Sequence, residues 1–72
     1  MYNKKDKVKV DNAKLYTSFC SNESNTVING YYFIYDERIK NNRIRITDTE
    51  ERVDIPCSMT GWIDLSCIEK VE

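Results

Sequence analysis

A chain of 72 residues has room for one domain and not for a second. It contains no histidine, which excludes Ser-His and Cys-His nucleophile pairs and the histidine ligands of most zinc sites. Five lysines and two aspartates precede residue 15, yet the net charge of -1 leaves no concentrated basic face for nucleic acid. Because so small a domain builds a substrate cleft with difficulty, we expect a non-catalytic binding module with no cofactor and no metal.

The three cysteines, Cys20, Cys57 and Cys67, lie far apart in the sequence and form no C-x-x-C pair. Their odd number excludes a fully paired disulfide framework. Free thiols in a reducing compartment are the favoured interpretation. A single Cys57–Cys67 bridge stays the alternative, because both residues flank the last predicted strand. Met1 is followed by a polar, lysine-rich stretch, so we expect synthesis in the cytoplasm without a signal peptide, and no contact with a membrane.

The beginning of the chain predicts short strands. Residues 1–7 are polar and lysine-rich, and we expect them to form a flexible arm before a folded domain over residues 8–72. Val8 and Val10 alternate with charged residues, which predicts the first strand. A second alternation over residues 15–19 predicts another strand, and a polar loop of turn-forming residues follows it.

The middle of the chain carries the strongest strand signals. A brief strand at residues 26–28 is expected to end at the turn dipeptide Asn29-Gly30. The run of aromatic and β-branched residues at 31–35 predicts a strand and not a helix.

A tight connection and an alternating strand come next. Residues 36–42 are expected to be the connection, with positive φ at Asn41-Asn42. Residues 43–47 alternate isoleucine with arginine, which predicts that the isoleucines point inward and the arginines outward. To bury their apolar faces, the strands at 31–35 and 43–47 must pair antiparallel.

The end of the chain predicts a loop and a last strand. Residues 48–60 form a polar loop with one proline and, at most, a single helical turn near residues 48–53. Residues 61–65 predict the last confident strand, after which Ile68 and Val71 close the end of the domain. Five to six short strands without a helix of normal length predict an all-β fold, a small SH3-like or OB-like barrel.

Four phrases occur in order along the chain: LYTS at 15–18, GYYFIYD at 30–36, NRIRIT at 42–47 and TGWID at 60–64. Together they resemble the bacterial SH3-like (SH3b) domains of endolysins and autolysins from Gram-positive spore-forming bacteria and their phages. The resemblance covers roughly residues 8–68. It implies a five-stranded SH3-like barrel whose usual task is to hold a lytic enzyme on peptidoglycan.

Six side chains are candidates for ligand contact. The aromatic ones could stack on sugar rings, and the arginines could form a fork for carboxylates. Each choice has an alternative: the rings could pack in the core or across strands, and the arginines could pair with Asp36 or Glu37. The six candidates are Tyr16, Tyr32, Tyr35, Arg43, Arg45 and Trp62.

Two functions are consistent with these observations. The first is a non-catalytic SH3-like module that recognises cell-wall peptidoglycan, alone or as the partner of a lytic enzyme, and acts at the wall after lysis. The alternative is a structural protein of a phage particle, either a capsid-decorating or a tail component. It would contact other proteins, as an oligomer or assembly subunit, through an exposed strand edge.

Overall fold

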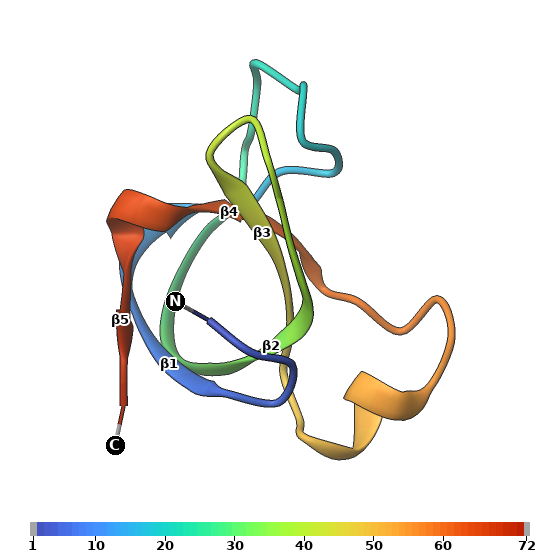
Figure 1. The fold of residues 1–72 in the computed structure, drawn as a ribbon. Helices are drawn as coiled ribbons and strands as arrows, with labels where there is room; N and C mark the ends of the chain where they lie inside the picture. Colours follow the sequence, from blue (N-terminus) through green and yellow to red (C-terminus); the bar gives the residue numbers. More distant parts are fainter. Residues whose placement is uncertain (1, 72) are drawn as a thin grey trace.

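The computed structural model describes residues 2–71, which form one five-stranded antiparallel sheet (Figure 1). The strand order in the sheet is β4-β3-β2-β1-β5. Two short 3-10 turns complete the fold, one in the loop before β4 and one between β4 and β5. The elements are β1 (Lys7–Lys14), β2 (Val27–Lys40), β3 (Arg43–Thr47), η1 (Glu51–Asp54), β4 (Gly61–Asp64), η2 (Leu65–Cys67) and β5 (Ile68–Lys70).

The sheet curls until β4 meets the chain that leaves β1, as the end-on view shows (Figure 1). Just beyond β1, the chain pairs with β4: the Tyr16 N–H donates to the Trp62 carbonyl, and the Trp62 N–H donates back, each over 2.8 Å. Gly61 makes this approach possible, because a Cβ there would lie 2.8 Å from the Tyr16 carbonyl oxygen. The predicted all-β class and five-stranded SH3-like barrel are therefore confirmed.

The core is a compact set of small aliphatic side chains that point into the barrel. Every member is at most 1% exposed. The isoleucines of β3 belong to this set, as their alternation predicts, and they pair with those of β2 and β4 across the sheet. The core residues are Val8, Val10, Ala13, Ile34, Ile44, Ile46 and Ile63.

β2 is one continuous strand where the sequence predicts two strands with a turn between them. The prediction of a turn at Asn29-Gly30 is wrong. Gly30 has φ 114° and Asn12 φ 49°, and the β1–β2 register shifts between Val10 and Ala13. The Asn12 N–H donates to Asn29 Oδ1 over 2.6 Å. The positive φ of Gly30 therefore belongs to a β-bulge within the β1–β2 pair and not to a turn. β2 continues through the bulge because β1 pairs with it both before and after Gly30.

Two further predictions about local structure have opposite outcomes. Asn41 and Asn42 have φ 51° and 61° and form the two-residue turn between β2 and β3, so the predicted positive φ is confirmed. β2 nevertheless extends to Lys40, through most of the predicted connection. The strand predicted at residues 15–19 is wrong: only Tyr16 is paired, and the chain then leaves the sheet as a loop that ends at Thr26.

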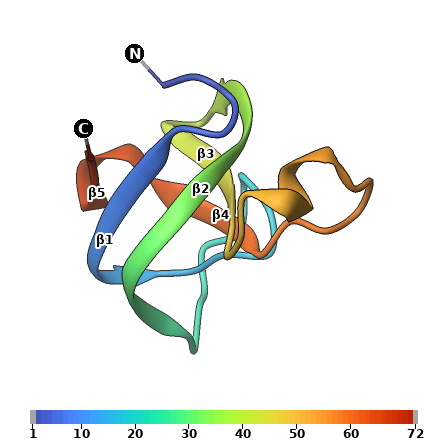
Figure 2. The same cartoon turned by 90° about the horizontal axis from the view of Figure 1, so that it is seen from below.

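Residues 2–6 differ from the flexible arm expected at residues 1–7. The Lys5 N–H donates to the Ile34 carbonyl, and the Ile34 N–H donates to the Asp6 carbonyl. Tyr2 packs against the core, and the segment crosses the open end of the barrel (Figures 1 and 2). The folded unit therefore begins before residue 8, while residue 1 lies outside the described part. We call residues 2–6 the N-terminal cap.

Three other findings concern the described residues as a whole. Cys20, Cys57 and Cys67 are free thiols, so the Cys57–Cys67 bridge is not formed. The helical turn expected near residues 48–53 is the 3-10 turn η1. Between residues 2 and 71, no helix has the length and apolar character needed to cross a bilayer.

Candidate binding site

Five of the six candidate residues gather on the outer face of β2, β3 and β4. Arg43 and Arg45 come from β3, Trp62 from β4 and Tyr35 from β2, and Tyr16 reaches them from just beyond β1. Tyr32 lies elsewhere. It stands opposite Val8 in the β1–β2 register and packs, half-buried, against the core.

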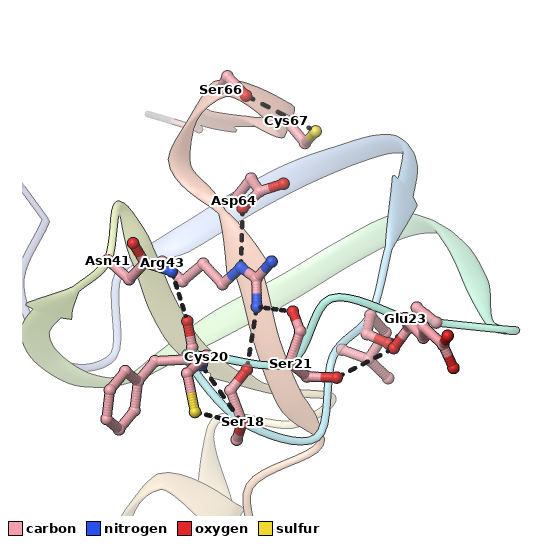
Figure 3. A network of polar contacts seen from close by, with 12 residues as sticks. Ser18, Cys20, Ser21, Glu23, Asn41, Arg43, Asp64, Ser66 and Cys67 are labelled. Atoms are coloured by element: carbon pink, nitrogen blue, oxygen red, sulfur yellow. Dashed lines mark hydrogen bonds and ion pairs between the residues drawn. The ribbon is translucent and has the colours of Figure 1, made fainter.

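Arg43 is covered rather than exposed, which corrects the prediction that it points freely outward. Its Nε donates to Asp64 Oδ1 over 3.0 Å, and its Nη1 donates to the carbonyls of Ser18 (3.1 Å) and Ser21 (2.7 Å) (Figure 3). Its guanidinium carbon lies 3.6 Å from the centre of the Tyr16 ring. Only 10% of the side chain is exposed, because the loop after β1 folds over it.

Arg45 lies beside Arg43 on β3 and is held by one acid and two rings. Its Nη2 forms an ion pair with Asp36, so the expected cross-strand pairing with that residue is confirmed. The guanidinium carbon lies 5.2 Å from the Trp62 ring and 6.0 Å from the Tyr35 ring. Its buried Nε has no hydrogen-bond partner among the described residues. Guanidiniums that stack on rings in this way gain electrostatic and dispersion energy together.

We call this set the cation–aromatic layer: Tyr16, Tyr35, Arg43, Arg45 and Trp62. Trp62 is only 8% exposed, so the layer is mostly closed to a ligand. Its contacts join residues from all four phrases on which the SH3b resemblance rests. Through these contacts the layer connects the loop after β1 to the strands, which is a structural task.

The loop at residues 15–26 is attached to the barrel mainly through its backbone. Besides the two carbonyls held by Arg43, the Phe19 carbonyl accepts a hydrogen bond from Asn41 Nδ2 over 2.9 Å. At the base of the loop, the Leu15 N–H donates to the Thr26 carbonyl over 2.9 Å, and Ser24 Oγ donates to the Leu15 carbonyl. The loop is thus ordered along its length although it lacks a strand.

Two features of this loop face solvent. One is a shallow hollow of ≈ 410 Å³, the loop depression, lined by Leu15, Thr17, Ser21, Glu23, Ser24, Asn25 and Thr26. The other is Phe19, which is 37% exposed and rests edge-on against Trp62 with ring centres 5.5 Å apart. The Lys40 ammonium lies 5.2 Å from the Phe19 ring. Sequence reasoning missed Phe19 because the alternation at 15–19 assigned it to a strand.

Lys5 and Asp6 of the N-terminal cap have shifted pKa values, and so does Asp54, which forms an ion pair with Lys5. The Asp54 carboxylate raises the pKa of Lys5 by a hydrogen bond and by its charge, and Lys5 lowers the pKa of Asp54 in return. The Asn3 N–H lowers the pKa of Asp6, with a smaller contribution from Lys70. Over residues 2–71, no group of three or more acidic or thiol side chains is placed to hold a metal ion.

The arrangement offers groups for hydrogen bonding and for ring stacking. The loop presents hydroxyl, amide and carboxylate groups in its depression and, separately, the exposed ring of Phe19. Comparison of the chain with family models, with curated proteins and with solved structures finds no match in any of the three.

Proposed function

We propose that this chain is a non-catalytic SH3-like binding module whose ligand is bacterial cell-wall peptidoglycan. The observation that carries the proposal is the loop at residues 15–26, whose backbone accepts hydrogen bonds from Arg43 and Asn41 and which carries the loop depression and Phe19. The four phrases shared with SH3b domains favour the cell wall over other ligands.

The five residues of the cation–aromatic layer then have an indirect role. They position the loop, while the ligand contacts Phe19 and the polar groups of the loop depression. Hydroxyl, amide and carboxylate groups around a hollow suit the hydroxyls and amides of a glycan–peptide polymer, and an exposed ring suits the flat face of a sugar. Fixing the loop before binding reduces the entropy lost on association.

The test is co-sedimentation with purified walls of a Gram-positive spore-forming bacterium at moderate salt. We expect the intact protein to sediment with the walls, and failure to sediment would overturn the proposal. Phe19→Ala should weaken sedimentation several-fold. Ile55→Ala is the matched control, because Ile55 is also an exposed apolar side chain but lies in the loop before β4. Equal loss in both variants would contradict a role for the loop at 15–26.

A second candidate, a structural component of a phage particle, is favoured by one observation. Among residues 2–71, β5 pairs only with β1, which leaves its other edge to a strand from a neighbouring protein. Mass spectrometry of purified virions distinguishes the two: many copies per particle would support this candidate over the first.

A further inference from the structure

A second surface, formed by β2, β1 and β5, has the groups needed to bind a ligand. In the strand register, Lys9 of β1 stands opposite Tyr31 of β2 on one side and opposite Glu69 of β5 on the other. All three side chains are exposed, so they form a row across three strands. We call it the β1 row. It shares no residue with the loop depression or the cation–aromatic layer.

Tyr31 is the most exposed large apolar side chain of the described residues, at 56%. The Lys7 ammonium lies 4.8 Å from the centre of its ring. Neither Lys7 nor Lys9 forms an ion pair with any residue from 2 to 71, whereas Lys5 and Lys70 both do. An accessible ring with the Lys7 ammonium beside it, and with Lys9 opposite it in the strand register, suits a flat ligand that carries an acidic group.

A hollow of ≈ 460 Å³ adjoins the row, and Lys9 and Glu69 belong to both. Its lining combines opposite charges with a hydroxyl: Lys9, Asp11, Ser66, Cys67, Ile68 and Glu69. Two carboxylates in the hollow repel a chain of closely spaced phosphates, but they accept hydrogen bonds from the hydroxyls of a sugar. The ligand that satisfies every group is therefore a sugar with an isolated carboxylate.

We propose that the β1 row and its hollow form a binding site for an acidic saccharide. One sugar face stacks on Tyr31, its carboxylate contacts Lys7 and Lys9, and its hydroxyls donate to Asp11 and Glu69. This adds a second ligand-binding face to the one assigned above and does not depend on it.

The test is an NMR titration of the full-length, isotope-labelled protein with methyl glucuronide, and with methyl glucoside as the uncharged probe of the same shape. We expect amide shifts confined to residues near the β1 row, with binding on the order of millimolar. The glucoside should bind at least threefold more weakly. No shifts at 50-fold molar excess or above would overturn the proposal, and so would equal binding of the two sugars or shifts confined to residues 15–26.

Variants make the assignment specific. Tyr31→Ala and Lys9→Gln should each reduce glucuronide binding at least threefold, while Tyr31→Phe should retain it. Lys14→Gln is the matched control, since Lys14 is another exposed lysine of β1 outside the row. Thermal melting of each variant shows whether the barrel is intact. Tighter binding of inorganic polyphosphate than of glucuronide would overturn the choice of ligand. Because the probe is a soluble sugar, failure here leaves the wall co-sedimentation result standing on its own.

Discussion

Gly61 lies where the chain leaving β1 meets β4, and its missing side chain determines how closely the two can approach. A Cβ would fall within 2.9 Å of two Leu15 side-chain atoms and of the Tyr16 carbonyl oxygen. The leucine can rotate away, but the carbonyl cannot move without loss of the Tyr16–Trp62 pairing that closes the barrel.

We therefore expect Gly61→Ala to reduce the free energy of unfolding by about 1–3 kcal/mol, the usual cost of overpacking a tight site. Urea denaturation measures the change. Thr60→Ala is the control, because Thr60 is the exposed neighbour and should change stability by less than about 0.5 kcal/mol. Equal midpoints for Gly61→Ala and the unmodified protein would contradict this view of barrel closure.

Arg43 carries a second prediction at the residue scale. Arg43→Met leaves Asp64 without its partner and removes the donor to two loop carbonyls, so we expect a loss of about 3 kcal/mol. Arg38→Met is the matched control, since Arg38 is an exposed arginine near the end of β2. Urea denaturation gives the stability, and amide hydrogen exchange should show faster exchange in the loop at 15–26 for the Arg43 variant alone. Unchanged exchange there would show that the loop is held by other contacts.

At the scale of the element, the β2–β3 turn can be improved. Both of its central residues have positive φ, which costs an ordinary L-residue about 1–2 kcal/mol and asparagine less. Asn41 is needed, because its side chain donates to the Phe19 carbonyl. We expect Asn42→Gly to stabilise the protein by up to about 1 kcal/mol and Asn42→Ala to destabilise it by a similar amount. Thermal denaturation of the two variants tests this. A higher melting temperature for Asn42→Ala than for Asn42→Gly would contradict the turn geometry.

The elements also show what sequence patterns can predict and where they fail. The strands at residues 8–10, 31–35 and 43–47 and the turn at Asn41-Asn42 followed from period-2 alternation and turn chemistry, which are local properties. The bulge at Gly30 did not, because the same dipeptide fits a turn or a bulge and only the pairing with β1 decides between them. Residues 15–19 alternate like a strand, yet the loop that they begin is held by hydrogen bonds from Arg43 and Asn41, which are distant in the sequence.

The candidate site divides in the same way. Sequence reasoning identified residues that cluster in space, and five of the six do. It could not show that these residues contact one another, since the contacts of Arg43 reach as far as Tyr16, which is 27 residues away in the sequence. Nor could it show that the rings of Phe19 and Tyr31 are exposed, because the exposure of a ring depends on how the barrel folds around it.

At the scale of the whole molecule, the N-terminal cap makes stability depend on pH. The lowered pKa values of Asp6 and Asp54 mean that their contribution is complete above the unfolded-state pKa of about 4 and is lost as the pH falls through the lower folded-state values. The raised pKa of Lys5 acts in the opposite direction: its contribution is complete below about pH 10 and is lost only as the pH rises through its folded-state pKa.

We therefore expect a plateau of stability across neutral pH and a decline below about pH 4. Urea midpoints measured from pH 2 to 7 test this. Asp6→Asn and Asp54→Asn should each flatten the decline slightly, since both groups lie near solvent and added salt screens them. Glu37→Gln should leave the slope unchanged, because Glu37 is exposed and belongs to neither of the ion pairs formed by Asp6 and Asp54. If neither aspartate variant alters the decline in stability, other carboxylates cause the acid sensitivity.

The way the barrel holds the loop at residues 15–26 has a consequence for evolution and for engineering. Arg43 and Asn41 donate hydrogen bonds to backbone carbonyl oxygens of the loop. Because every amino acid has a backbone carbonyl, these contacts specify the path of the loop and not its side chains. Outward positions such as Thr17, Asn22, Glu23 and Asn25 can therefore be exchanged without refolding the domain. A lineage, or a randomised library, could change what the protein recognises while the same five strands, Arg43 and Asn41 continue to support the loop.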